Sequence, residues 1–132
     1  MFKTSTNKEK KVLCLFYNEF NIETGAEIIF QYPKKYNDNK RSYLQQEDYL
    51  KISEFVIPRP ELCHKSISLK LGDSHLIGYP VLLEHKNYLR TNFQFNFTII
   101  ISSSEYKKNY IIYEMLIKKI GKIFENLEVG YL

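Results

Sequence analysis

The sequence predicts an α+β domain in which helices pack on an antiparallel sheet, in the order β-β-α-β-β-β-α. Apolar residues recur at every second position in five separate segments, which is the period of β-strands. Several of these segments are joined by short turn sequences, so successive strands are expected to pair antiparallel. Near the C-terminus the apolar period changes to three and four, which is typical of an amphipathic helix. Helices are expected to cover one or both faces of the sheet.

Length, charge and cysteine content exclude several classes of protein. A chain of 132 residues can bury one hydrophobic core. The net charge of +4 comes from widely spread lysines, which favours a solvated surface over a nucleic-acid interface. No stretch has the length and apolarity of a membrane span, and no signal peptide is predicted, so a cytosolic protein is expected. Cys14 and Cys63 lack metal-ligand spacing and are expected to be reduced thiols in or near the core.

The first two strands are predicted to form a hairpin. Residues 1–10 are polar and predict a flexible N-terminal arm, and the folded domain is expected to span residues 11–128. Lys11–Tyr17 is apolar on both faces, which predicts a central strand. Ala26–Tyr32 follows as the second strand, and Pro33 ends it because proline cannot donate to the ladder.

One helix is expected between this hairpin and the remaining strands. It follows the polar, exposed loop Lys34–Arg41 and is predicted over Ser42–Ser53. Pro58 and Pro60 exclude helix beyond Ile57, because each lacks a backbone donor and disfavours helical geometry in its predecessor. The apolar stripe of this helix is irregular and consists of Tyr43, Leu44, Leu50 and Ile52.

Three further strands follow. His64–Leu71 alternates in polarity, and Gly72-Asp73-Ser74 predicts a hairpin turn into the strand Leu76–Leu83. After the polar loop Glu84–Asn92, Phe93–Ile101 is the last strand, with aromatic and aliphatic residues on one face. Its other face carries the polar residues Gln94, Asn96 and Thr98.

A long helix is predicted to end the domain and to lie on the sheet. Ser102-x-x-Glu105 is a capping-box pattern at its start. The opposite, charged side carries Glu114, Lys118, Lys122 and Glu125. The apolar stripe expected to face the sheet consists of Ile112, Leu116, Ile120, Ile123 and Leu127.

Several residues invite a chemical interpretation. Arg90 lies on a loop between two stiff strands, a place where a charge can reach a partner. His85 beside Glu84 suggests a general base, but no nucleophile is placed with the pair, which favours a structural loop or a partner contact. His64 and His75 flank one hairpin and could form a metal pair; without further ligands, surface or edge positions are favoured. The sequence contains no strand followed by a glycine-rich loop and a helix, so no phosphate-binding loop is predicted.

Separate motifs, in order, resemble the N-terminal domain of the nitrogen permease regulator 2-like family, and together they cover nearly the whole chain. The arrangement of elements is similar to a longin domain, a five-stranded antiparallel sheet with helices packed on it. The motifs are Phe16–Phe20 with Gly25–Pro33, then Ile57-Pro58-Arg59-Pro60-Glu61-Leu62-Cys63, then Leu76-Ile77-Gly78-Tyr79-Pro80-Val81, Glu84-His85-Lys86-Asn87-Tyr88-Leu89-Arg90, and Phe95-Asn96.

The chain departs from the family pattern at three places. It has Gly25-Ala26 where the family usually has Gly-Pro, and Arg90-Thr91 where the family usually has Arg-Asn. The segment Lys34–Glu47 is longer than usual. Family members also continue well past residue 132, so residues 129–132 are expected to begin a linker to a C-terminal part.

The resemblance implies a role in amino-acid signalling. Members pair with a nitrogen permease regulator 3-like longin partner and, with a larger third subunit, form a GTPase-activating complex for Rag-type small GTPases. This complex inhibits TORC signalling on amino-acid starvation, from the cytoplasm and by recruitment to the lysosomal or vacuolar membrane, so membrane association is indirect. The motif places the family's catalytic arginine finger on Arg90. Glu84, His85, Lys86 and Tyr88 are expected to support its loop.

The chemistry of an arginine finger suits this loop, but a second class of function stays open. A guanidinium is planar, permanently charged and able to contact two oxygens, so it can stabilise charge on a transferring phosphoryl group. No cofactor, metal or stand-alone enzymatic activity is expected. The alternative is a non-catalytic longin module that only dimerises or scaffolds in a trafficking or signalling complex. An apolar sheet edge or helix face would serve that role.

Overall fold

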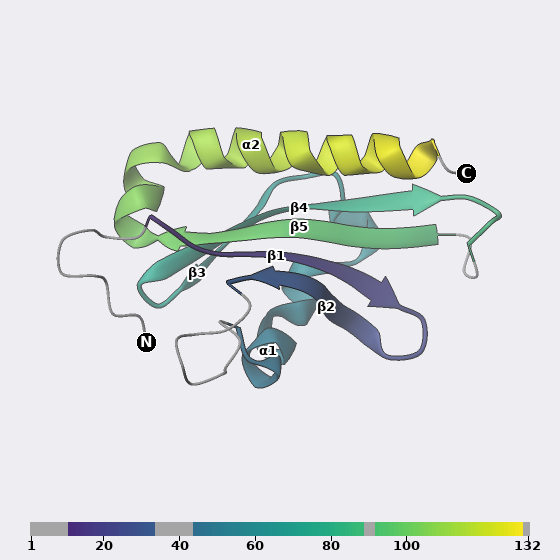
Figure 1. Cartoon of the computed structure of the whole chain (residues 1–132), viewed down its shortest axis with the longest axis horizontal. Coiled ribbons are helices and arrows are strands. Elements are labelled where there is room, and N and C mark those ends of the chain that lie inside the picture. The colour runs from purple at the N-terminus through teal and green to yellow at the C-terminus, as the bar shows by residue number, and fades with distance from the viewer. Residues whose placement is uncertain (1–10, 34–43, 89–91, 131–132) are drawn as a thin grey trace.

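The computed structural model describes residues 11–33, 44–88 and 92–130, and its elements follow the predicted order (Figure 1). Five strands form one antiparallel sheet in the order β2-β1-β5-β4-β3, which confirms the α+β prediction. One helix packs on each face. The elements are β1 (Val12–Asn21), β2 (Gly25–Tyr32), α1 (Gln46–Val56), the short 3-10 helix η2 (Pro60–Leu62), β3 (Ile67–Leu71), β4 (Ser74–Glu84), β5 (Asn92–Ser102) and α2 (Ser103–Val129).

Two strand boundaries differ from the prediction by three or more residues. β1 continues to Asn21 instead of ending at Tyr17, because the side chain of the fully buried Asn18 donates a hydrogen bond to the hydroxyl of Tyr49 (2.9 Å). This donor can therefore lie inside the sheet, although its polarity suggested a loop, while Oδ1 of the same amide has no hydrogen-bond partner among the described residues. β3 begins at Ile67 and not at His64, because His64 has a left-handed backbone (φ 65°).

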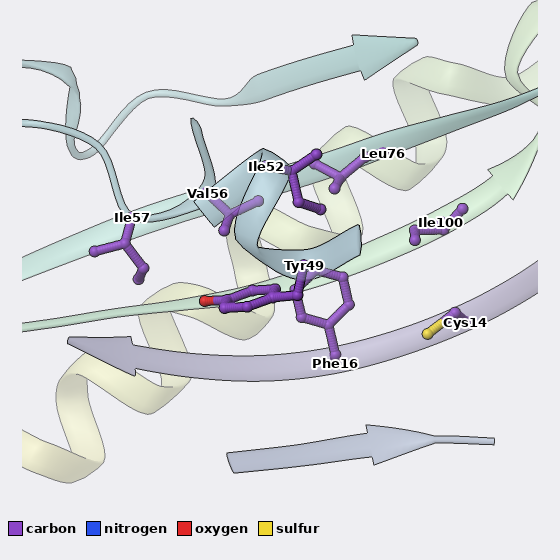
Figure 2. Close-up of a cluster of buried hydrophobic side chains, with 8 residues drawn as sticks. All are labelled: Cys14, Phe16, Tyr49, Ile52, Val56, Ile57, Leu76 and Ile100. Carbon is purple, nitrogen blue, oxygen red and sulfur yellow. The ribbon is translucent and has the colours of Figure 1, made fainter. Parts of the chain in front are cut away.

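The helix α1 covers one face of the sheet. It ends at Val56, before Pro58 as expected, and begins at Gln46; residues 42–43 of the predicted helix lie outside the described part. Leu50, expected in its apolar stripe, is 57% exposed. The buried side chains are Tyr49, Ile52 and Val56 at helical spacing, and they pack on a cluster that Figure 2 shows, with Cys14, Phe16, Ile57, Leu76 and Ile100. The short helix η2 carries Pro60 at its first position, where a missing donor costs nothing.

The polar face of β5 is buried beneath α1 and the segment after it. Both oxygen and nitrogen of the Asn96 side chain are used: Oδ1 accepts from the Tyr79 amide (3.0 Å), and Nδ2 donates to the Val56 carbonyl (2.7 Å). The Gln94 side chain donates to the Pro58 carbonyl in the same way (2.5 Å). These side chains satisfy carbonyls at and beyond the end of α1, where a helix leaves them without partners. They join α1 to the two strands β4 and β5.

The start of α2 keeps half of the predicted capping box. The Ser102 hydroxyl accepts from the Glu105 amide (3.2 Å), as expected of an N-cap. The Glu105 carboxylate does not return to the Ser102 amide, which donates to the Lys11 carbonyl instead (3.1 Å). It accepts from Asn109 and Tyr113 (2.9 and 2.8 Å), and these two hydrogen bonds lower the pKa of Glu105.

The face of α2 that contacts the sheet is not the one predicted. The inner face places the buried Ile117 and Gly121, with the half-buried Tyr113 and Phe124, over β4 and β5. A Cβ at Gly121 would lie 2.9 Å from a ring carbon of Tyr79, so only glycine allows this close approach. The predicted stripe is exposed instead, apart from the half-buried Ile120: Ile112 by 62%, Leu116 by 46%, Ile123 by 49% and Leu127 by 58%.

Both sides of α2 are thus apolar, which is why the period alone did not identify the inner face. No helix within the described residues combines the length and the apolarity that a bilayer crossing needs. The outer residues Ile112, Leu116, Ile123 and Leu127 are called the α2 stripe below.

We expect Asn96→Ala to lower the free energy of unfolding by about 2–4 kcal/mol, because it leaves the Tyr79 donor and the Val56 acceptor buried without partners. Urea denaturation measures this difference. The control is Thr98→Val, since the buried Thr98 hydroxyl has no hydrogen-bond partner among the described residues, and its loss should change stability by less than about 1 kcal/mol. Equal effects of the two substitutions would contradict the structural role of Asn96.

Candidate functional site

The candidate site lies at the end of the sheet where β4 passes into β5. Arg90, with Leu89 and Thr91, lies outside the described residues, so only the flanks of its loop are considered. Glu84, the last residue of β4, pairs with Asn92, the first residue of β5. Both strands are interior in the sheet. The loop is therefore supported at its base by neighbours on each side.

The first residues of this loop form a turn around His85. Its carbonyl accepts from the Tyr88 amide (3.1 Å), and its Nδ1 accepts from the Asn87 amide (3.1 Å). Glu84 and Lys86 are exposed, and neither forms a salt bridge within the described part of the chain. No described serine or cysteine is hydrogen-bonded to His85. The histidine thus organises the turn, and nothing around it supports a nucleophile activated by a base.

Tyr88 connects this turn to the last turn of α2. Its hydroxyl donates to Glu128 Oε2 (2.6 Å), and its ring packs against Phe93 with the centroids 5.4 Å apart. Burial and the hydrogen bond to Glu128 raise the pKa of Tyr88 to about 12. Sequence reasoning missed Glu128. An acidic side chain in the last turn of a helix opposes the helix dipole, and this signal could have indicated a compensating donor.

An aromatic groove opens beside this connection, between the C-terminal half of α2 and the strands β5, β1 and β2. Its volume is about 500 Å³. Leu127 belongs both to its wall and to the α2 stripe, so groove and stripe form one continuous apolar surface. Phe30, at the edge of the groove on β2, is 56% exposed. The groove is lined by Tyr17, Phe30, Phe93, Phe95, Phe97, Phe124, Leu127 and Glu128.

A second cavity lies at the same end of the sheet but on the α1 face. Its volume is about 440 Å³. Its walls include Arg59, which is exposed, and Asn92 and Gln94, which are half-buried. Arg59 belongs to the Pro-Arg-Pro motif and was not predicted to have a role. The structure thus places a second arginine near the base of the β4–β5 loop.

The remaining polar candidates lie elsewhere. His64 contacts the Leu82 carbonyl oxygen through Nε2 (3.0 Å). The His75 ring instead stacks on the Tyr106 ring, with the ring centroids 3.8 Å apart. Leu82 and His75 are seven residues apart along β4, or about 23 Å. The two histidines therefore do not form a metal pair, and no cluster of three potential ligands occurs within the described residues.

Neither cysteine is an activated nucleophile. Cys14 and Cys63 are free and buried, as expected for reduced thiols in the core. Burial raises the pKa of Cys14 to about 12 and that of Cys63 to about 11, so both remain thiols at neutral pH.

The motif residues Gly78, Tyr79 and Asn96 meet in space. A Cβ on Gly78 would lie 2.9 Å from Nδ2 and 3.0 Å from Oδ1 of Asn96, so glycine leaves room for the amide that binds the Tyr79 backbone. Downstream of Tyr79, the Pro80 carbonyl accepts from the His64 amide (2.7 Å). The motifs thus hold the end of α1 and the segment at His64 to the strands β4 and β5.

Comparisons with known proteins agree with this arrangement. A family model, nitrogen permease regulator 2, matches residues 10–132. The chain is 32% identical over 114 residues to Nitrogen permease regulator 2 of Saccharomyces cerevisiae, covering 86% of this chain and 17% of the relative. It is 27% identical over 121 residues to the GATOR complex protein NPRL2 of Drosophila melanogaster, covering 91% of this chain and 27% of the relative.

A shorter match is to the Nitrogen permease regulator 2 homolog of Schizosaccharomyces pombe, 35% identical over 77 residues, covering 58% of this chain and 18% of the relative. The chain thus corresponds to between 17% and 27% of the length of these relatives.

Gly78→Ala should destabilise the domain by about 1–3 kcal/mol, because the added methyl group forces the Asn96 amide away from its two partners. Thermal or urea unfolding checks this. The control is Gly130→Ala at the end of α2, where the backbone is right-handed (φ −65°) and the nearest atom to a new Cβ is 3.4 Å away. If both substitutions are equally mild, the space at Gly78 is not required.

Proposed function

Because the chain belongs to the nitrogen permease regulator 2 family, we propose that it is the longin domain of a subunit of a GTPase-activating complex, and that Arg90 is its arginine finger. The target is a Rag-type small GTPase, whose stimulated GTP hydrolysis inhibits TORC signalling on amino-acid starvation. One relative is named as a GATOR complex protein, which supports membership of a multi-subunit assembly.

The assembly that we propose contains a nitrogen permease regulator 3-like longin partner and a larger third subunit. This chain would pair with the longin partner domain against domain. The complex would act from the cytoplasm at the lysosomal or vacuolar membrane, to which it is recruited without inserting. Because the chain corresponds to at most 27% of its relatives, these activities belong to the whole protein and not to this domain alone.

The observation that carries the catalytic proposal is the support of the β4–β5 loop. A finger must extend from the surface and yet hold its position, since a small misplacement costs much of the rate. Here the loop that contains Arg90 starts and ends on the paired residues Glu84 and Asn92 of two interior strands. Its first turn is closed by His85 and tied to α2 through Tyr88.

The reaction requires little else from this chain. A small GTPase supplies the phosphate-binding loop, the magnesium ion and the residue that orients water, and an arginine in trans adds positive charge where the transferring phosphoryl group develops negative charge. Such an arginine contributes a factor of about 10³–10⁵ in rate, or roughly 4–7 kcal/mol. The planar guanidinium contacts two oxygens in a fixed, forked geometry, whereas a lysine presents a point charge on a flexible stem.

We expect Arg90→Ala to lower the stimulated rate of GTP hydrolysis by about 10³-fold or more, while the complex still assembles. Arg90→Lys should recover only a small part of this loss, because it keeps the charge but not the forked geometry. Single-turnover hydrolysis by a Rag-type GTPase with the assembled complex measures both. Arg59→Ala serves as the comparison, since Arg59 is an exposed arginine that lines one cavity together with Asn92, the first residue of β5. Full stimulation of hydrolysis by the Arg90→Ala complex would disprove the assignment of the finger to Arg90. A loss of stimulation confined to Arg59→Ala would assign the finger to Arg59 instead.

A second candidate function is a longin module that only dimerises or scaffolds. The observation that favours it is the α2 stripe, whose four residues are 46–62% exposed and continuous with the aromatic groove. Contiguous exposed apolar surface of this kind marks sites of protein association. The two functions are compatible, because pairing through this surface would deliver the finger.

The double substitution Leu116→Asp with Ile123→Asp should weaken binding of the longin partner by about 30-fold or more, because it places carboxylates in an apolar interface. Stability of the free chain should change little, since both side chains are already exposed. Leu50→Asp on α1, where Leu50 is 57% exposed, is the control. If only Leu50→Asp weakens binding, the partner contacts the α1 face and not the α2 stripe.

A further inference from the structure

We infer that Tyr88 and Glu128 are a pair of positioning residues, which fix the start of the β4–β5 loop to the last turn of α2 and so determine where the loop presents its arginine. The inference rests on the proposed function for its effect on GTP hydrolysis. The tie itself is a property of described residues and can be tested separately.

The contact has the geometry of a strong hydrogen bond. The distance from the Tyr88 hydroxyl to Glu128 Oε2 is 2.6 Å, which is in the range of hydroxyl groups that donate to a carboxylate. It joins residues that are 40 positions apart in the sequence and that belong to different elements. The ring is held as well, because it packs on Phe93 and meets the His85 ring edge-on (centroids 6.5 Å apart, 81°).

Tyr88 is close enough to Arg90 in the sequence for its anchorage to matter. Only Leu89 separates them, so the covalent chain limits the distance between their Cα atoms to about 7 Å. On the other side, Thr91 alone separates Arg90 from Asn92, which the sheet holds through Glu84. Losing the Tyr88 anchor would leave the loop held firmly at one end only. The position of a guanidinium at a reaction centre is sensitive to such a change.

The helix gains no evident benefit from the carboxylate of Glu128 by itself. An acidic residue in the last turn faces the partial negative charge of free carbonyl groups. No salt bridge to Glu128 occurs among the described residues, and its Oε2 accepts from Tyr88. Because the pKa of Tyr88 is raised to about 12, the hydroxyl remains a donor throughout the physiological range. The pair thus accounts for a residue that local helix chemistry does not explain.

The test uses Tyr88→Phe and Glu128→Ala, singly and together, in the assembled complex with a Rag-type GTPase. Tyr88→Phe removes the hydroxyl but keeps the ring on Phe93. We expect each single variant to lower the maximal stimulated rate by about 10-fold to 100-fold, with the affinity for the GTPase unchanged. The double variant should be no worse than either single one, because both remove the same contact. Tyr32→Phe is the control, as Tyr32 is 65% exposed on the edge strand β2.

Hydrogen exchange of the peptide covering residues 84–94 gives a readout that does not depend on catalysis. Exchange should accelerate in Tyr88→Phe and Glu128→Ala, and not in Tyr32→Phe, while the unfolding midpoint stays within the range of the control. Unchanged exchange would overturn the tie. If Tyr88→Phe and Glu128→Ala leave the maximal rate unchanged while Arg90→Ala lowers it, the positioning role is overturned and the proposed function stands. A rate change that appears only as weaker GTPase affinity would make Tyr88 a contact residue instead.

If Arg90→Ala has no effect, the proposed function fails and the positioning role fails with it. The exchange measurement then still decides whether Tyr88 and Glu128 hold the loop. A last arm introduces Tyr88→Phe into the Arg90→Ala variant, where it should cause no further loss of rate. An additional loss there would show that Tyr88 acts independently of the arginine and would overturn the inference.

Discussion

The side-chain amide of Asn96 is the contact on which the rest of this domain depends. It lies on the central strand and joins the Tyr79 backbone in β4 to the end of α1 through one oxygen and one nitrogen. Burying a primary amide costs free energy unless its polar atoms are hydrogen-bonded, and in Asn96 both the oxygen and the nitrogen are. The requirement extends outward, since Gly78 must lack a side chain to make room and Gln94 repeats the arrangement at Pro58. This polar row fixes the face of the sheet that α1 covers, and it lies directly behind the strands that carry the loop.

The opposite face is organised by aromatic packing and is only partly covered. α2 lies over β4 and β5, which leaves the aromatic groove open beside the helix, along β5, β1 and β2. The β1–β2 turn, the end of β4, the start of β5 and the C-terminal end of α2 all lie at one end of the molecule (Figure 1). At the end of the sheet where the loop begins, one face is thus polar and covered, and the other is aromatic and more open. The same helix thus accepts the hydrogen bond from Tyr88 and carries the exposed α2 stripe.

Strand periodicity was enough to predict the fold, but polarity was a poor guide to burial. Five strands, their antiparallel pairing and the two helices followed from alternation, turns and proline positions. The predicted end of β1 was wrong because the buried Asn18 side chain donates to Tyr49, a partner that no local pattern shows. The inner face of α2 was wrong because both faces are apolar and a single glycine, Gly121, decides between them. For the site, the sequence indicated Tyr88 as a support of the Arg90 loop. The hydrogen bond from Tyr88 to Glu128 could not be predicted, because the two residues are 40 positions apart and meet only through packing of α2 on the sheet. The role of Arg90 itself stays a prediction.

The α2 stripe also bears on how much of this protein a cell can maintain. Four exposed aliphatic side chains and a neighbouring aromatic groove form an apolar surface on a copy without a bound partner. Chaperones and other proteins that bind exposed apolar surface would bind it. Such orphan copies are expected to be cleared by quality control, so the abundance of the domain should follow that of whatever covers it. In the assembly proposed above, degradation of surplus copies, and not matched synthesis, would then set the stoichiometry.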